Sequence, residues 1–254
     1  MASIAERHKY ILENLARNGF IKVIDIAKEL DVTPVTIRKD LKYLEEKKLL
    51  YRTHGSASPI NPLTSDIDVE EKEKMQKDEK KRIAIAASKL IEENDSIIIA
   101  SGSTVHTLAE HITPINHLTV VTASLKASLL LNTLNNIEII QLGGTVRKNS
   151  SSVIGDYTSK FFEQITCSKL FLGVDGIDIE HGITNSNIEE AILNKKMIEA
   201  SLRTIILADS SKFGRRGFGK ICNLDRVDVI ITDDGISKAM AKSIEEAGIE
   251  LIIV

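Results

Sequence analysis

Seven short apolar runs in the last two thirds of the chain constrain its fold more than any other feature. They are rich in isoleucine, leucine and valine and lie at 96–100, 118–122, 137–142, 169–174, 203–208, 227–231 and 249–254. Amphipathic stretches of helical periodicity separate most of them, at 79–93, 104–112, 124–134, 186–201 and 235–247. Near-continuous apolar strands that alternate with helices are typical of a parallel sheet covered on both faces. The pattern predicts an α/β domain over 79–254, with ligands at the carboxyl ends of its strands.

The first 58 residues show a different pattern. Helical periodicity predicts one helix over 5–17, a second after a short strand-like run at Ile21, and a third over 33–46. Thr33 is a suitable N-cap for the third helix, and Pro34 suits its first position because an N–H there would have no partner. A short β-ribbon that turns at Gly55 follows. Three helices and a ribbon form the winged-helix arrangement, a variant of helix-turn-helix.

The third predicted helix has an apolar face made by Ile37, Leu41 and Leu44, so its basic residues fall on the remaining surface. Such a helix is suited to a DNA groove, where its cations meet phosphates or base edges. For His54, beside Gly55 in the ribbon, a structural role in the turn is an equal alternative. The predicted DNA contacts are Thr33, Val35, Thr36, Arg38, Lys39, Lys42, Arg52 and His54.

The charge of the chain is unevenly distributed, in agreement with a DNA-binding N-terminal part. The net charge of −3 alone argues against a nucleic-acid binder. Residues 1–58 nevertheless contain 11 Lys/Arg and 8 Asp/Glu, a balance of +3, and the remaining residues contain 22 and 28, a balance of −6. The basic segment is therefore the candidate DNA-contacting part.

Composition bounds the class of protein. The chain has 254 residues and a hydrophobic content of 43%, so we expect two globular domains. No apolar run approaches the roughly 18 residues of a membrane span, and the N-terminus is too polar for a secretory signal. Cys167 and Cys222 match no metal pattern and are interpreted as reduced thiols. We expect a cytoplasmic protein that makes no contact with a membrane.

The segment between the two parts changes character. Pro59, Asn61, Pro62 and Ser65 disfavour regular structure, and a run of mixed charge follows over 66–78. Such a composition is typical of a solvated linker that enters a helix. The sequence therefore predicts a DNA-binding domain over 1–58, a linker over 59–78 and a ligand-binding domain over 79–254.

Polar loops follow several of the predicted strands. The hydroxyl-rich loop at 101–104 leads directly into a helix, where backbone N–H groups suit a phosphate. Arg147 or Lys148, after a Gly-Gly pair, could meet an anion, and Lys212 stands among serines as a point charge for a phosphate. Asp175 and Asp178 could bind sugar hydroxyls or act as acid and base. Each loop alone is also an ordinary turn or helix cap, but together at one sheet edge they predict a shared cleft for an anionic ligand.

Motifs of several enzyme classes are absent from the sequence. It contains no Walker A pattern, no G-x-G-x-x-G, no His/Cys cluster with metal spacing and no G-x-S-x-G elbow. We therefore expect neither a catalytic residue nor a metal or other cofactor.

These residues resemble the DeoR family of transcriptional regulators over nearly the whole chain. The N-terminal signature is present as Leu30-Asp-Val-Thr-Pro-Val-Thr-Ile-Arg-Lys-Asp-Leu41, and the ribbon as Leu50-Tyr-Arg-Thr-His-Gly55. The family's later motifs follow in order as Ser101-Gly-Ser-Thr104, Leu142-Gly-Gly-Thr-Val-Arg147, Gly173-Val-Asp-Gly-Ile177, Gly182-Ile-Thr184 and Asp209-Ser-Ser-Lys-Phe-Gly214. The chain departs from the pattern at Ala100, Ala123 and Ser56, where the family usually has Asp, Asn and Gly.

The resemblance implies a winged-helix repressor with a Rossmann-like C-terminal domain similar to ribose-5-phosphate isomerase and used as a sensor. It implies that Ser101, Gly102, Ser103 and Thr104 hold a phosphate with Lys212 as its cation. It also implies that the sugar end is formed by Asp175, Thr184, Glu190 and Lys195.

The predicted function is a non-enzymatic repressor of a carbohydrate-utilisation operon, released from double-stranded operator DNA by a sugar phosphate. Because one small DNA-binding module binds weakly, a homo-oligomer, dimer or tetramer, is expected. Two alternatives stay open. One is a sugar-phosphate isomerase that uses Asp175, Asp178 and Glu190, and the other is an activator or a sensor of a non-phosphorylated ligand.

Overall fold

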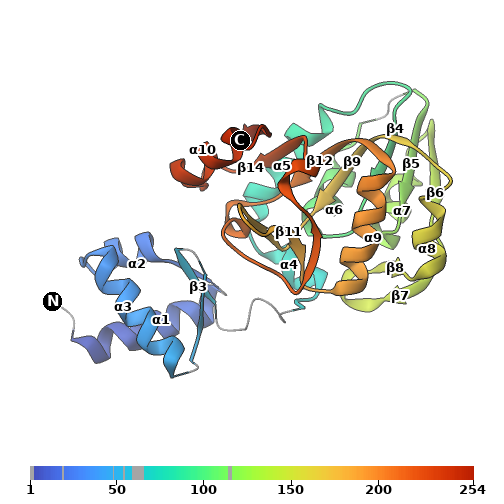
Figure 1. Cartoon of the computed structure of the whole chain (residues 1–254). Helices are drawn as coiled ribbons and strands as arrows, with labels where there is room; N and C mark the ends of the chain where they lie inside the picture. The colour runs from blue at the N-terminus through green and yellow to red at the C-terminus, as the bar shows by residue number, and fades with distance from the viewer. Residues whose placement is uncertain (1–2, 19, 48, 54, 59–65, 114–115) are drawn as a thin grey trace. The chain divides into compact units, whose positions relative to one another are not determined.

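The chain forms two compact units, Met1–Ser65 and Asp66–Val254, each of which is described by itself (Figure 1). The structure is a computed structural model that describes residues 3–18, 20–47, 49–53, 55–58, 66–113 and 116–254. The boundary differs from the predicted one. The sequence predicted a linker up to residue 78, whereas the chain from Asp66 onward belongs to the second unit.

The first unit contains three helices, α1 (Ile4–Asn18), α2 (Val23–Glu29) and α3 (Pro34–Glu46). Three short strands, β1 (Ile21–Lys22), β2 (Tyr51–Thr53) and β3 (Ser56–Ser58), pair antiparallel in the order β1-β3-β2. This is the predicted winged-helix arrangement. It forms because apolar residues at helical spacing on all three helices bury against one another and against the ribbon: Ile11, Leu15, Ile26, Ile37, Leu41, Leu44, Leu50 and Ala57.

A buried carboxylate joins α1 to α3. Asp40 is 6% exposed and accepts hydrogen bonds from Arg7 Nε at 2.8 Å and Arg7 Nη2 at 3.0 Å, and its Oδ1 lies 3.2 Å from His8 Nε2. A bidentate arginine fixes both the distance and the orientation of its partner. Asp40 therefore holds α3 in a defined orientation on α1.

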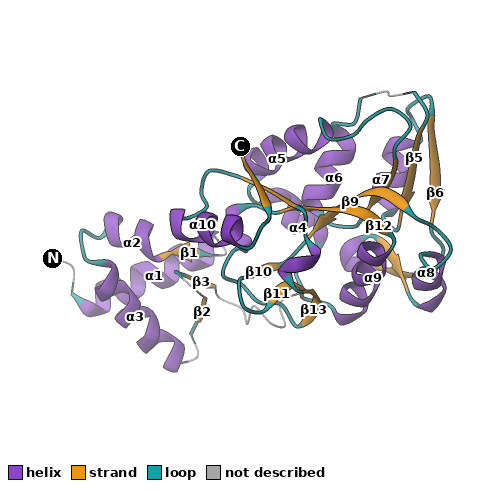
Figure 2. Cartoon of the chain, turned by 45° about the horizontal axis from the view of Figure 1, so that its top comes forward, coloured by secondary structure: helices purple, strands orange, loops and turns teal. Residues whose placement is uncertain are grey.

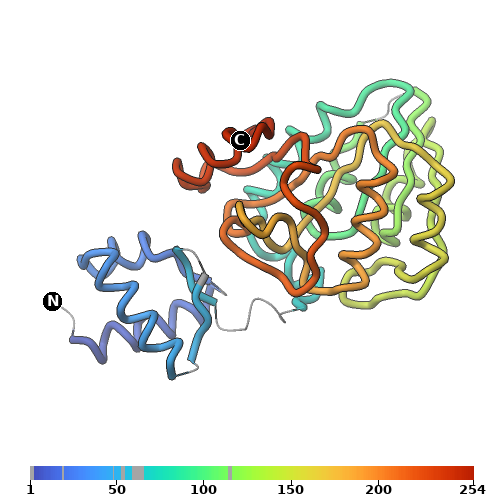
Figure 3. Tube along the Cα trace, viewed as in Figure 1, coloured from blue at the N-terminus to red at the C-terminus, as the bar shows by residue number. Residues whose placement is uncertain are grey.

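The second unit is built on a seven-stranded parallel sheet of order β15-β14-β12-β9-β4-β5-β6. Its strands correspond to the seven predicted runs: β4 (Ser96–Ile99), β5 (Leu118–Thr122), β6 (Ile137–Gln141), β9 (Cys167–Gly173), β12 (Ser201–Leu207), β14 (Val229–Thr232) and β15 (Glu250–Ile253). Renumbered along the chain, this order is 3-2-1-4-5-6-7, the Rossmann arrangement. The path can be followed in Figure 3, and the order reverses between β4 and β9.

Helices cover both faces of the sheet. Side chains alternate along each strand, so Ile97 and Ile99 of β4 pack on one face and Ile98 on the other. Figure 2 shows α5 (Lys77–Ser88), α6 (Ser103–Glu110) and α7 (Leu125–Leu131) on the first side. Residues of α8 (Asp156–Phe161), α9 (Ile188–Glu199) and α10 (Lys238–Glu246) pack on the second. The predicted α/β class is confirmed.

Several short elements were not predicted. They are the hairpin of β7 (Thr145–Arg147) and β8 (Ser152–Ile154), the small sheet of β10 (Gly176–Asp178), β11 (Gly182–Asn185) and β13 (Gly219–Cys222), helix α4 (Val69–Lys74), and 3-10 turns at Lys148–Ser150, Ser210–Lys212 and Leu224–Arg226. Segments of three to six residues are too short to show a hydrophobic period, which is why the sequence pattern missed them.

Helix α4 contradicts the predicted solvated linker over its described part. Asp68 caps this helix by accepting a hydrogen bond from Glu70 N at 2.9 Å, and Val69 is 4% exposed. The Lys80 ammonium donates to the carbonyl oxygens of Lys72 and Met75. The run of 66–78 is therefore held on the second unit at Val69 and Lys72, while Glu70, Glu71, Lys74, Lys77 and Asp78 are exposed. Among the described residues, none of the helices has the length and apolar character needed to cross a membrane.

Candidate functional site

The exposed surface of α3 is basic. Arg38, Lys39 and Lys42 are exposed, and within the described part of the chain none of them forms an ion pair. We call these three residues the α3 basic face. Their free cationic groups leave this surface able to neutralise phosphates without first breaking an internal contact.

The N-terminal tip of α3 is arranged as the sequence predicted. Thr36 N donates to Thr33 Oγ1 at 3.2 Å, so Thr33 caps the helix, and Pro34 follows at its first turn. Val35 is 56% exposed. A capped, exposed tip of this kind can approach base edges closely, because few side chains stand in front of it.

The ribbon differs from the prediction at one of its two candidate residues. Arg52 is exposed, but its Nε donates to Glu45 Oε2 at 2.7 Å and its backbone N donates to Glu45 Oε1 at 2.9 Å. The acidic partner neutralises part of the charge that the sequence assigned to DNA. The other candidate, His54, lies outside the described residues.

In the second unit, loops at the carboxyl ends of the strands enclose one pocket at the point where the strand order reverses. Open α/β sheets bind ligands in this crevice. We call it the strand-end pocket. Its lining includes seven of the nine predicted ligand residues: Ser101, Gly102, Ser103, Thr104, Asp175, Glu190 and Lys212. Arg147, which the sequence raised as a possible anion partner, lines it as well, together with residues that the sequence did not assign to the ligand: Asp66, Ile67, Val69, Lys72, Asn149, Ser150, Gly173, Val174 and Asn185.

The N-terminus of α6 faces this pocket. The chain leaves β4 and turns at Gly102, whose φ of +125° is accessible to glycine but rarely to other residues. No side chain caps α6 at this position, so the first backbone N–H groups of the helix are not occupied by a cap. Together with the helix dipole they form a site for an anion. Gly173 on β9 lets α6 pack closely, because a Cβ there would meet Val105 Cγ2 at 3.1 Å.

Lys212 brings a positive charge to the same pocket. Within the described chain its ammonium group has no carboxylate at ion-pair distance. Burial lowers the pKa of Lys212, and the nearby Lys72 and Arg215 act in the same direction, although Asp209 and Asp175 oppose them. An anion bound beside Lys212 would favour its charged form, so the group is suited to a phosphate.

Asp175 is the most constrained carboxylate of the pocket. It accepts from Lys72 Nζ at 2.7 Å, from Ser186 Oγ at 2.7 Å and from Ser186 N at 3.0 Å. Burial acts to raise the pKa of Asp175, but the Lys72 and Lys212 ammonium groups outweigh it and hold that pKa well below its usual range. Asp175 is therefore ionised and acts as a hydrogen-bond acceptor.

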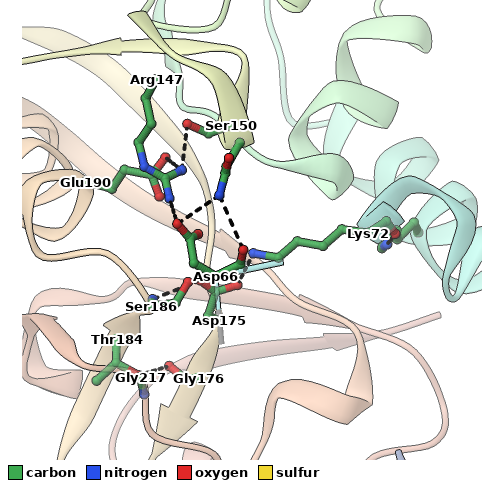
Figure 4. A network of polar contacts seen from close by, with 12 residues as sticks. Asp66, Lys72, Arg147, Ser150, Asp175, Gly176, Thr184, Ser186, Glu190 and Gly217 are labelled. Carbon is green, nitrogen blue, oxygen red and sulfur yellow. Dashed lines mark hydrogen bonds and ion pairs between the residues drawn. The ribbon is translucent and has the colours of Figure 1, made fainter. Parts of the chain in front are cut away.

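Arg147 forms the opposite wall, between two carboxylates (Figure 4). It is paired with Asp66, its Nη1 lies 3.2 Å from Glu190 Oε1, and the same Nη1 donates to Ser150 Oγ at 3.0 Å. Burial raises the pKa of Glu190, and Asp175 adds to this effect while Arg147 opposes it. The sequence had raised Arg147 as an anion partner, and the hairpin of β7 and β8 brings it here. Lys148, its predicted alternative, is exposed and absent from the lining.

Two predicted ligand residues do not line the pocket. Thr184 is fully buried, accepts from Gly217 N at 2.8 Å and donates to Gly176 O at 3.3 Å, so its hydroxyl stabilises the small sheet. Side chains alternate along β11, and the next residue, Asn185, lines the pocket instead. Lys195 is exposed because it lies five residues, about 140° of helix rotation, from Glu190 on α9.

Asn185 is a functional candidate that the sequence did not reveal. Its side chain is 6% exposed, and its Oδ1 has no hydrogen-bond partner among the described residues. A buried acceptor without a partner costs free energy unless a ligand or water supplies a donor. The residue sits in a Gly-Ile-Thr-Asn strand whose period-2 alternation was the signal that could have identified it.

The family departures at Ala100 and Ala123 do not reach the pocket. Both residues are 1% exposed and pack in the apolar cluster on the α9 face of the sheet. These two departures from the family pattern are therefore core positions and are absent from the pocket lining. Ser56 lies in β3, paired with Lys22 and Thr53. In the described part of the chain, no cluster of three or more His, Cys, Asp or Glu side chains could hold a metal ion.

Comparisons with known proteins identify both units. The model of the DeoR-like helix-turn-helix domain matches residues 7–62, and that of the DeoR C-terminal sensor domain matches residues 75–234. The HTH-type transcriptional regulator YulB of Bacillus subtilis is 37% identical over 99% of this chain and 97% of its own length. The glycerol-3-phosphate regulon repressor of Haemophilus influenzae is 30% identical over 97% of this chain and 96% of its own.

Among solved structures, ribose 5-phosphate isomerase A from Methanocaldococcus jannaschii matches 54% of each chain at 16% identity, with a TM-score of 0.39. The family assignment depends on the sequence matches, which extend across both units. This chain belongs to the DeoR family of transcriptional regulators.

Proposed function

We propose that this chain represses a carbohydrate-utilisation operon and leaves its operator when a sugar phosphate binds the strand-end pocket. The observation that carries the proposal is the meeting of the α6 N-terminus and the Lys212 ammonium group in one pocket. A helix N-terminus and a lysine without a carboxylate partner suit a phosphate dianion. One relative is a glycerol-3-phosphate regulon repressor, which supports a phosphorylated ligand.

The remaining wall of the pocket suits the sugar. Asp175, Glu190 and Asn185 offer acceptor oxygens, and Arg147 and Asn149 offer donors. A sugar hydroxyl both donates and accepts, so it can pair with either kind of group. We assign the phosphate to Ser101, Gly102, Ser103, Thr104 and Lys212, and the sugar hydroxyls to the opposite wall.

For the DNA contact we propose the α3 basic face together with Thr33, Val35 and Thr36 at the helix tip. Arg52 contributes only if DNA replaces its Glu45 partner. A single winged helix binds weakly, so we propose a homo-oligomer that reads repeated half-sites. Ligand binding then needs to favour a state with poor operator fit. A hundredfold loss of operator affinity corresponds to about 2.7 kcal/mol of differential binding.

The test combines ligand binding and operator release. A thermal-shift screen with ribose 5-phosphate, glucose 6-phosphate, fructose 6-phosphate and glycerol 3-phosphate should raise the Tm for at least one compound. Lys212→Ala should remove that shift and the release of DNA while leaving operator binding intact. Lys220→Ala, which removes an exposed lysine of β13, is the matched control. An unchanged response of Lys212→Ala, or a shift with the unphosphorylated sugars alone, contradicts the phosphate site.

The isomerase alternative receives less support from the site. Asp178 is 5% exposed, accepts from Arg216 Nε at 2.9 Å and Nη2 at 3.0 Å, and is absent from the pocket lining. Asp175 is already committed to Lys72 and Ser186. Turnover of pentose or amino-sugar phosphates by the purified protein would nevertheless establish this alternative.

A further inference from the structure

The segment of residues 66–74, which precedes the sheet, occupies part of the strand-end pocket. Asp66, Ile67, Val69 and Lys72 all belong to its lining. Asp66 pairs with Arg147, and Lys72 pairs with Asp175 (Figure 4). Two residues that the sequence placed in a solvated linker therefore contact two charged groups on opposite walls of the predicted ligand site.

The segment leaves little room for a ligand. The space that remains in the pocket is about 50 Å³, whereas pockets that bind small molecules measure roughly 300 Å³ or more. A volume of 50 Å³ corresponds to one or two waters, since each occupies about 30 Å³ in the liquid. A sugar phosphate needs more room than this, which points to movement of the segment when one binds.

The two charged side chains of the segment occupy positions that suit sugar hydroxyls. The Asp66 carboxylate accepts from Arg147 and from Asn149 Nδ2 at 3.2 Å. The Lys72 ammonium donates to Asp175 at 2.7 Å. The wall with Arg147 and Asn149 thus requires an acceptor, and the wall with Asp175 requires a donor. Adjacent hydroxyl groups of a polyol supply both. Asn185 Oδ1, which has no donor among the described residues, would gain a partner if such a molecule replaced the segment.

Polar contacts at its rim hold the segment in place. Glu73 lies 3.0 Å from Lys126 Nζ and 3.2 Å from His106 Nδ1. Lys80 donates to the carbonyl oxygens of Lys72 in α4 and of Met75 directly after it. Val69 is its deeply buried apolar anchor, at 4% exposure. A short helix held mainly by hydrogen bonds and ion pairs can exchange them for water or for ligand hydroxyls at modest cost.

We propose that the 66–74 segment is an internal ligand of the strand-end pocket, which the sugar phosphate displaces. The inference rests on the proposed function and adds its mechanism of control. In the sequence only seven residues, 59–65, separate Asp66 from Ser58 at the end of the ribbon. Displacement of the segment therefore changes the attachment point of the DNA-binding unit, so effector binding and the freedom of that unit are coupled.

The first test loosens the segment. Asp66→Ala removes the contact with Arg147 but leaves Arg147 its Glu190 partner, so the fold is preserved. An internal ligand lowers apparent affinity by the fraction of molecules in which the pocket is free. We expect the variant to bind at least one of the four sugar phosphates about tenfold more tightly than wild type. Inorganic phosphate, which needs no space at the sugar end, should change less than about threefold.

The matched control is Glu71→Gln, an exposed position on α4 outside the pocket, which should bind like wild type. Equal sugar-phosphate affinities of wild type and Asp66→Ala would overturn the inference. Failure of the proposed function looks different: none of the four sugar phosphates would bind either protein, and both proposals would fall.

The second test observes the segment directly and does not depend on a variant. Hydrogen exchange of the backbone amides of 66–74 is measured with and without a saturating concentration of the tightest sugar phosphate. Displacement predicts faster exchange in the complex, because the hydrogen bonds of α4 are lost. Slower or unchanged exchange would mean that the segment closes over the ligand or stays in place, and either result overturns the inference.

Discussion

The two units of this protein present positive charge in opposite ways. On α3, Arg38, Lys39 and Lys42 are exposed and have no ion-pair partner within the described chain. In the strand-end pocket, Lys72 and Arg147 already contact Asp175, Asp66 and Glu190. The first surface is ready for any polyanion. Lys72 and Arg147 in the second are neutralised from within, so a ligand at that end has to replace existing contacts, and only Lys212 has no carboxylate at ion-pair distance among the described residues of the lining.

Under the proposed function, this difference explains why the first unit can bind DNA without an effector and why the second unit can respond to an effector. Exposed cations release counterions when they meet DNA, and the resulting affinity depends strongly on salt and weakly on shape. Buried charges lose solvation, so they select a partner that restores every contact. We therefore propose that the pocket provides selectivity for one small molecule and that α3 provides affinity for a long polyanion.

The largest effect is expected at the buried ion pair of the first unit. Asp40→Ala removes both hydrogen bonds that the carboxylate accepts from the largely buried Arg7 and should destabilise that unit by about 3 kcal/mol. Urea unfolding followed by circular dichroism measures it. Glu46→Ala, at an exposed position of the same helix, is the control. A change below about 0.5 kcal/mol would mean that Asp40 does not hold α3 on α1.

The next largest effect concerns the α3 basic face. Arg38→Ala should weaken operator binding at least about a hundredfold, or 2.7 kcal/mol, in a mobility-shift titration, with oligomer size and ligand binding unchanged. Lys238→Ala removes an exposed lysine of the second unit and should bind the operator normally. Loss of folding in Arg38→Ala would instead show that the residue supports the structure of the helix.

A buried cation should show pH dependence that an exposed one lacks. Burial, together with Lys212, lowers the pKa of Lys80 to about 8. Between pH 8 and the ordinary lysine pKa near 10.5, the unfolded chain binds more protons than the folded chain. The free energy of unfolding therefore rises with pH in this range. The free energy of unfolding of wild type relative to Lys80→Met should increase by up to about 2 kcal/mol from pH 7 to 9.5. Lys39→Met should show no such trend, and a flat Lys80 profile would argue against burial of its charge.

The smallest effect separates the two basic surfaces by salt. Lys42→Ala should weaken operator binding by about 1 kcal/mol and reduce the slope of log affinity against log salt by about 1 per subunit. Lys212→Ala should leave that slope unchanged, because its charge faces the pocket. Equal changes in the two variants would remove the distinction between the surfaces.

The sequence predicted the long elements well. Thr33 and Pro34 specify the start of α3 by their own chemistry, and the seven strands follow from continuous apolar runs. Seven predicted ligand residues share the pocket because parallel strands end at one edge of a sheet. Thr184 and Lys195 do not line the pocket, since strand alternation and helix rotation decide which way a side chain points and the boundaries of β11 and α9 were unknown from the sequence.

What the sequence by itself determined is the class of each unit and the loops that carry its chemistry, because periodicity, caps and strand ends are local properties. The tertiary structure alone decided which charges meet. Asp66 and Arg147 lie 81 residues apart and Lys72 and Asp175 lie 103 apart, and no local pattern encodes such a pairing. The run of 66–78 is charged like a linker, yet the pocket supplies partners for its charges. Opposite charges that the fold brings together, rather than the composition of the segment, place it in the lining of the pocket.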